Sequence, residues 1–135
     1  MKYNQSALLL IFVMFGMSAC SDSGANFEEA QPAEATFASI QVNVLNRSCA
    51  ISGCHNGTES PNLNEGVAYN NIVNRASGQR NFNLIEPGNP NSSYLYLKLV
   101  GGNISGGIMP RGQSRLSAAV TDSIRAWIEN GALNN

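Results

Sequence analysis

The chain has 135 residues and a formal net charge of −1, with nine acidic side chains against eight basic ones. A chain of this length forms one domain with a modest core, and its balanced charges without a basic stripe give no indication of nucleic-acid binding. It contains one histidine and three cysteines. Any metal or cofactor site that uses these residue types must therefore be built from very few side chains.

The first predicted element is an export signal over residues 1–19. Lys2 precedes an apolar run of about eleven residues, ALLLIFVMFGM, which ends in small residues. This pattern is typical of a signal peptide, and the run is shorter than the roughly 20 apolar residues that span a bilayer. Residues 17–20, Met-Ser-Ala-Cys, resemble the lipobox of bacterial lipoproteins.

The lipobox resemblance implies cleavage before Cys20 and lipidation of its thiol, which would anchor the protein to a membrane of the cell envelope. Ser21 follows the cysteine, and this resembles an outer-membrane address, facing the periplasm or the exterior. The alternative is an ordinary secretory peptide that leaves Cys20 free. Residues 20–35 are small and acidic, so they predict a lipidated cysteine followed by a flexible linker to a domain over residues 36–135.

The domain is expected to open with a helix that ends just before Cys49. Thr36 is a suitable N-cap residue for this helix. The apolar residues that follow have the helical spacing i, i+3, i+7, i+8 and would share one face: Phe37, Ile40, Val44 and Leu45.

The segment CAISGCH follows this helix and contains Cys49, Cys54 and His55. Outside the cytosol two nearby cysteines form a disulfide by default, whereas a zinc site needs more ligands than these three. The sequence Cys-x-x-Cys-His is the attachment motif of c-type haem, but here four residues separate the cysteines. The extra pair would have to bulge outward, and Ser52 and Gly53 permit a tight bend. From these residues alone, disulfide and haem attachment both stay open.

Two further helices are expected in the middle of the chain. Asn64 would cap the first, with one face formed by Tyr69, Ile72, Val73 and Ala76. The second would open at Asn89-Pro90 and stop at Gly101-Gly102. It would carry Tyr94, Leu95, Leu97, Lys98 and Leu99, although a short strand is an alternative for the same residues.

The last helix has the clearest pattern. Ser117 would cap it, Gly131 would close it, and its apolar face would consist of Val120, Ile124, Trp127 and Ile128. Four short helices form a thin core, and the loops 53–63 and 101–115 are longer than a compact domain usually carries without a purpose. A buried flat cofactor would give these segments a surface to pack on.

Met109 is the only methionine outside the predicted signal peptide, and it lies in a glycine-rich loop before Pro110. If His55 holds an iron, the internal donors for the opposite side are the Met109 thioether and the Lys98 amine, or there is none. Histidine and methionine together raise the reduction potential of a haem iron, a combination that suits electron transfer.

From about Phe37 onward the chain resembles small bacterial class I cytochrome c domains. The resemblance is carried by a helix ending in Cys…Cys-His-Asn-Gly and by the segments LNEGVAYNNIV, EPGNPNSSYLYLKL, GGIMPRG and LSAAVTDSIRAWIENGA, in this order. It implies an all-α, cytochrome c-like domain packed around one covalently attached haem c. By position, it implies that Cys49 and Cys54 hold the haem, that His55 is the proximal ligand and that Met109 is the distal ligand.

Other residues are candidates for supporting roles around the haem. The Pro61 carbonyl would accept the second ring N–H of His55, as ligating histidines usually require. Arg111 and Arg115 would pair with the propionates or remain on the surface. Three more cofactor contacts are expected at Pro110, Trp127 and Tyr94, although the last two would equally serve as core residues.

These observations favour a membrane-tethered electron carrier that docks transiently with other redox proteins and is not an enzyme. One alternative is the haem subunit of a redox enzyme or a gas sensor, with Met109 displaced from the iron. Another is a structural lipoprotein without cofactor, in which Cys49 and Cys54 form a disulfide.

Overall fold

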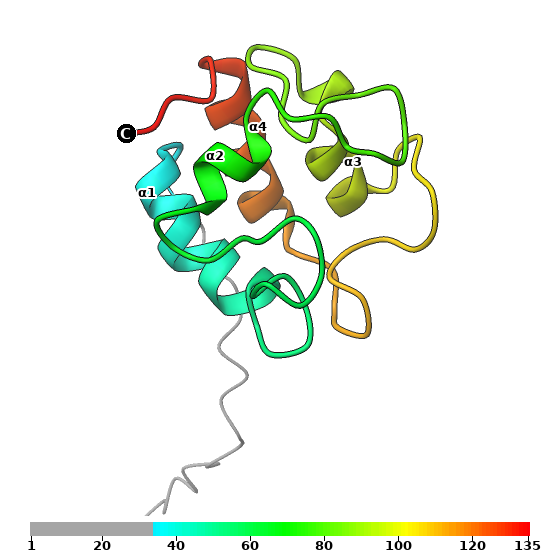
Figure 1. Ribbon diagram of the computed structural model, residues 1–135. Coiled ribbons are helices and arrows are strands. Elements are labelled where there is room, and N and C mark those ends of the chain that lie inside the picture. The colour runs from blue at the N-terminus through cyan, green and yellow to red at the C-terminus, as the bar shows by residue number, and fades with distance from the viewer. Residues whose placement is uncertain (1–33) are drawn as a thin grey trace, which may run out of the picture.

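The computed structural model describes residues 34–135 (Figure 1). The predicted signal peptide, Cys20 and most of the linker lie outside the described residues. Within residues 34–135, no helix is both long enough and apolar enough to cross a bilayer.

The domain begins with one continuous helical segment made of α1 (Phe37–Ile40) and the π-helix η1 (Gln41–Cys49). The Thr36 side chain caps it by accepting a hydrogen bond from the Ser39 N–H at 3.3 Å. The four apolar residues expected on one face are all buried. The predicted helix and its cap are therefore confirmed, and the helix runs on to include Cys49.

The second helix, α2 (Ala68–Ile72), is shorter than the sequence suggested. The predicted Asn64 side-chain cap is wrong, because Val67 occupies the N-cap position of α2 without a side-chain cap, and Asn64 Nδ2 donates to the Asn56 carbonyl at 3.0 Å. Gly66 has a φ of +82°, which interrupts the helical path before Ala68. Beyond the helix Val73 is extended and Ala76 is exposed, so neither continues the predicted helical face.

The third helix was predicted to start at Asn89-Pro90, but this position holds only the 3-10 turn η2 (Pro90–Ser92). Asn89 caps that turn by accepting the Ser92 N–H at 3.2 Å. Ser93 is extended, and α3 (Tyr94–Val100) starts after it and ends at Gly101, which is left-handed with a φ of 85°. Helix rather than strand is therefore correct for this segment, and the predicted stop is confirmed.

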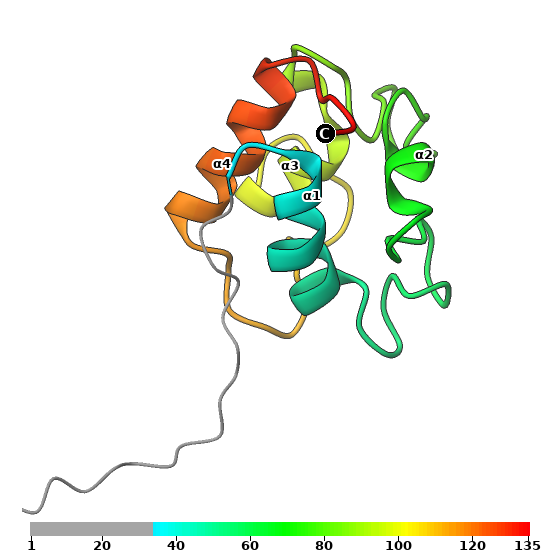
Figure 2. The same ribbon diagram turned by 90° about the vertical axis from the view of Figure 1, so that its left-hand side faces the viewer.

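The last helix, α4 (Ala118–Glu129), packs against α1 and α3. Its cap at Ser117 and its buried face are as predicted. Phe37 joins the N-terminal and C-terminal helices by packing its ring 5.6 Å from that of Trp127. The view in Figure 2 separates α4 from α2, which lie toward opposite sides of the domain.

The expected all-α class is confirmed for the described residues, which contain helices and isolated β-bridges but no sheet. The bridges join loop segments, for example Val73 with Ile85 and Asn83 with Ser93. The core follows the helices and reaches from Phe37 to Ala132. The long loops 53–63 and 101–115 fold over one side of this core, where they enclose the cavity described next.

Candidate cofactor site

A cavity of about 500 Å³ lies between η1, α3, α4 and the two long loops. Cofactor and ligand pockets usually have volumes of about 300–1,000 Å³, so this cavity has the size of a cofactor site. The structure brings together along it eight of the residues that were predicted to contact a cofactor: Cys49, Cys54, His55, Tyr94, Met109, Pro110, Arg111 and Trp127. Arg115, the second candidate for a propionate, is exposed and is not among the lining residues.

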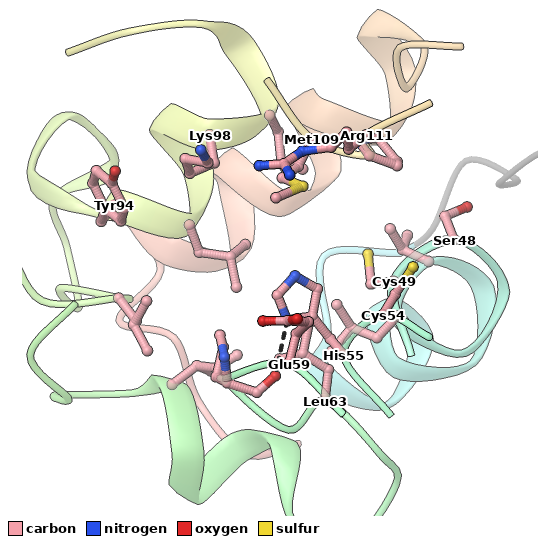
Figure 3. A pocket seen from close by; sticks show the side chains of 18 of the residues that line it. Ser48, Cys49, Cys54, His55, Glu59, Leu63, Tyr94, Lys98, Met109 and Arg111 are labelled. Carbon is pink, nitrogen blue, oxygen red and sulfur yellow. Dashed lines mark hydrogen bonds between the residues drawn. The ribbon is translucent and has the colours of Figure 1, made fainter. Parts of the chain in front are cut away.

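The widened cysteine motif forms a closed loop at the end of η1. The His55 N–H donates to the Cys49 carbonyl at 3.1 Å, and the Cys54 N–H donates to the Ile51 carbonyl at 3.0 Å. Ser52 and Gly53 are exposed, and Gly53 has a φ of +77° with open space where a Cβ would lie. Ser52 does not line the cavity, whereas Gly53 does, and Cys49, Cys54 and His55 reach the same wall of the cavity despite the wider spacing (Figure 3).

Cys49 and Cys54 are free thiols that do not form a disulfide with each other. Burial, and to a smaller degree charge repulsion from the nearby Cys54, together raise the pKa of the Cys49 thiol from 9.0 to about 12. Cys49 is therefore a protonated thiol at neutral pH. Within residues 34–135, no three side chains of histidine, cysteine or acidic type are grouped to hold a bare metal ion.

The imidazole of His55 is oriented by one hydrogen bond. Its Nδ1 lies 3.1 Å from the Pro61 carbonyl oxygen, which can only accept. Nδ1 must therefore carry the proton in this bond, and in the neutral imidazole this tautomer places the lone pair on Nε2. The predicted contact with Pro61 is confirmed, and Figure 3 shows the opposite edge of the ring pointing across the cavity toward Met109.

Met109 lies on the wall opposite His55, with its side chain directed into the cavity (Figure 3). It is partly buried against the core, and its backbone N–H donates to the Lys98 carbonyl at 2.9 Å. The other candidate donor, the Lys98 amine, is hydrogen-bonded to the carbonyls of Ser105 at 2.9 Å and Gly107 at 2.6 Å. Of the two candidate donors, the Lys98 amine is therefore engaged in hydrogen bonds, and the Met109 thioether is not.

The remaining predicted residues complete the walls. Trp127 is 2% exposed and donates its indole N–H to the Leu133 carbonyl at 2.8 Å, so it serves both the core and the cavity. Tyr94 is buried and donates its hydroxyl to Gln79 Oε1 at 2.9 Å. Arg111 is exposed on the cavity rim.

Several polar residues of the lining were not predicted, among them Glu59, Gln79 and Gln113. They lie in loops, where no periodic pattern indicates which way a side chain points.

Comparison of the chain with protein-family models, with curated proteins and with solved structures found no match. The site is thus defined by its own chemistry. It is an apolar cavity with an imidazole nitrogen and a thioether on opposite walls and two free thiols beside the imidazole.

Proposed function

We propose that the protein is a monohaem c-type cytochrome that carries electrons and has no catalytic activity of its own. The observation that supports this proposal is the pair formed by His55 and Met109, which face each other across a cavity of about 500 Å³. Imidazole and thioether are the two ligands of low-spin haem iron in electron-transfer cytochromes.

The two free thiols fit covalent attachment of the haem. Each S–H group, at Cys49 and at Cys54, would add across one vinyl group, so that a C–S bond forms and the hydrogen moves to the other vinyl carbon. This addition needs thiols that are not oxidised to a disulfide, and both cysteines have free thiols in the structure. The loop closed by the His55 N–H on the Cys49 carbonyl then keeps the imidazole next to both attachment points.

The protein residues would set the properties of the iron. When bound, the haem supplies a one-electron couple between ferrous and ferric iron. The Pro61 carbonyl holds the His55 ring in one tautomer, which leaves Nε2 available as a ligand. Apolar side chains such as Ile124 and Leu99 line the cavity and would shield a bound haem from water.

The proposal includes a lipid anchor at Cys20, which would hold the protein in the cell envelope at the outer membrane. A tethered domain meets its partners at a high effective concentration, so weak and transient docking to other redox proteins is sufficient. The near balance of acidic and basic residues favours little electrostatic steering.

The deciding experiment uses the full chain, produced in a host with haem-attachment machinery. The dithionite-reduced protein should show the sharp α band of a c-type haem, and its intact mass should exceed that of the mature chain by one haem plus acyl groups at the N-terminal cysteine. The matched control is the double variant Cys49→Ala/Cys54→Ala, which should have lost the covalent haem and kept the acyl groups.

Two results would contradict the proposal. A colourless wild-type protein whose mass is lower by two hydrogens would identify a structural lipoprotein with a Cys49–Cys54 disulfide. Ready binding of carbon monoxide by the resting ferrous protein, without a sulfur-to-iron charge-transfer band in the ferric form, would identify a gas sensor or enzyme subunit with an open iron.

A further inference from the structure

The backbone of Ser105, in the loop that carries Met109, is held at its N–H and at its carbonyl by two side chains of α3. Tyr94 and Lys98 are four residues apart on this helix and therefore lie on the same face. The Tyr94 hydroxyl accepts the Ser105 N–H at 3.0 Å, and the Lys98 Nζ donates to the Ser105 carbonyl at 2.9 Å. We call these two side chains the α3 clamp.

Lys98 continues this attachment up to Met109. Its Nζ also donates to the Gly107 carbonyl at 2.6 Å, and its own carbonyl accepts the Met109 N–H at 2.9 Å. The loop from Ser105 to Met109 is thus bound to α3 at three residues. Between them Gly106 has a φ of +70°, and glycine leaves a loop many conformations to choose from. The hydrogen bonds select one of these conformations.

The hydroxyl of Tyr94 is itself fixed. Tyr94 is 3% exposed, and its hydroxyl donates to Gln79 Oε1 at 2.9 Å, so its hydrogen points away from Ser105 and a lone pair faces the Ser105 N–H. Figure 3 shows Tyr94, Lys98 and Met109 on the wall that faces His55. A rigid helix therefore holds the loop that carries the thioether.

We propose that Tyr94 and Lys98 are positioning residues that hold Met109 against the cavity, where its thioether would keep external ligands away from a bound haem iron. This inference rests on the proposed haem function. If the inference holds, the α3 clamp is the feature that makes this fold an electron carrier and not a protein with an iron open to external ligands. Loosening the clamp should let an external ligand replace the thioether without change to His55 or to the cysteines.

The test uses Lys98→Met, Tyr94→Phe and Lys98→Arg in the full haem-bearing chain. Loss of hydrogen bonds from a charged donor should raise the carbon monoxide affinity of the ferrous Lys98→Met protein roughly 10- to 100-fold, and loss of a neutral bond should raise that of Tyr94→Phe roughly 2- to 10-fold. The sulfur-to-iron charge-transfer band of the ferric protein should weaken in parallel. Lys98→Arg retains a cationic donor and should stay closer to the wild type than Lys98→Met.

Matched control variants remove the same chemical groups elsewhere. Arg125→Met removes an exposed cation that pairs with Glu129 at 2.8 Å, and Tyr69→Phe removes a hydroxyl that donates to the Ala132 carbonyl at 2.9 Å. Neither residue lines the cavity. If the carbon monoxide affinity of Lys98→Met equals that of these controls, the positioning role is wrong.

A second readout does not need the haem. Amide hydrogen exchange in the full chain as isolated should be faster at Ser105 in Tyr94→Phe, by about tenfold or more relative to Tyr69→Phe, because the N–H has lost its acceptor. A wild-type chain without haem would refute the proposed function, and the exchange rate would still test the clamp. Unchanged exchange at Ser105 would overturn the clamp whether or not haem is present.

Discussion

At the scale of single residues, the Cys49 thiol makes stability depend on pH. Burial first, and then the charge of Cys54, raise its pKa from 9.0 to about 12 in the folded protein. The folded state therefore keeps the proton in a range where the unfolded chain releases it. The stabilisation is fully present below about pH 9 and is lost as the pH rises from about 9 toward 12. Before haem attachment, the free energy of unfolding should fall across this window.

This prediction is measured by denaturant unfolding of the haem-free chain at a series of pH values, in sucrose to support the fold. Cys49→Ala is the control, since the two proteins share every other ionisable group and the difference between them isolates the Cys49 thiol. A difference between the two proteins that stays constant from pH 8 to about 11 would show that the thiol is not protected in the folded state. Once the Cys49 sulfur is part of a thioether, the pH dependence of the difference between the two proteins should disappear.

The individual residues of the site were predictable where their chemistry is local. The contact of His55 with Pro61 followed from the need of a ligating imidazole for a second partner and from six residues of separation. The attachment of Ser105 to α3 was not predictable, because it depends on the path of a glycine-rich loop. Arg115 follows Met109 by only six residues, yet it is not among the residues that line the cavity.

At the scale of the elements, α4 carries much of the core. Ile128 is fully buried, and replacing a buried isoleucine by alanine leaves a cavity and costs about 2–5 kcal/mol. Ile128→Ala should therefore lower the free energy of unfolding by this amount, measured by denaturant titration. Val42→Ala is the control, since Val42 is 50% exposed on η1 and its truncation should change stability by no more than about 0.5 kcal/mol. Equal effects of the two changes would mean that α4 does not pack as described.

The ends of the elements show which information the sequence holds. The start of α4 is fixed by its own Ser117, whose side chain accepts the Val120 N–H, and such local signals are readable. The start of α3 is fixed by distant partners. Ser93 Oγ accepts the Glu86 N–H at 2.9 Å, and the Tyr94 N–H donates to the Asn83 carbonyl at 2.9 Å. These bonds hold Ser93 extended, so the helix begins after it and not at Asn89.

At the scale of the whole molecule, the helices enclose a cavity where a small domain would usually have its core. A dry cavity lowers stability by about 24 cal/mol per Å³, so a volume of about 500 Å³ corresponds to a cost on the order of 10 kcal/mol. The entire stability of a small domain is about 5–15 kcal/mol. This figure is an upper bound because water enters at the open rim, but water is a poor partner for the apolar walls, which include the buried Val44, Ile72 and Trp127.

We therefore expect the stability of the fold to depend on the cofactor that fills the cavity. The chain with covalently attached haem should exceed the haem-free Cys49→Ala/Cys54→Ala variant by several kcal/mol in free energy of unfolding, measured by circular dichroism in denaturant. Each single variant, Cys49→Ala or Cys54→Ala, keeps one thioether and should retain most of this difference, which separates the filling of the cavity from the loss of the thiols themselves. If the haem-free double variant were as stable as the haem-bearing chain, the cavity would not be the missing part of the core, and the loops around it would need another reason for their length.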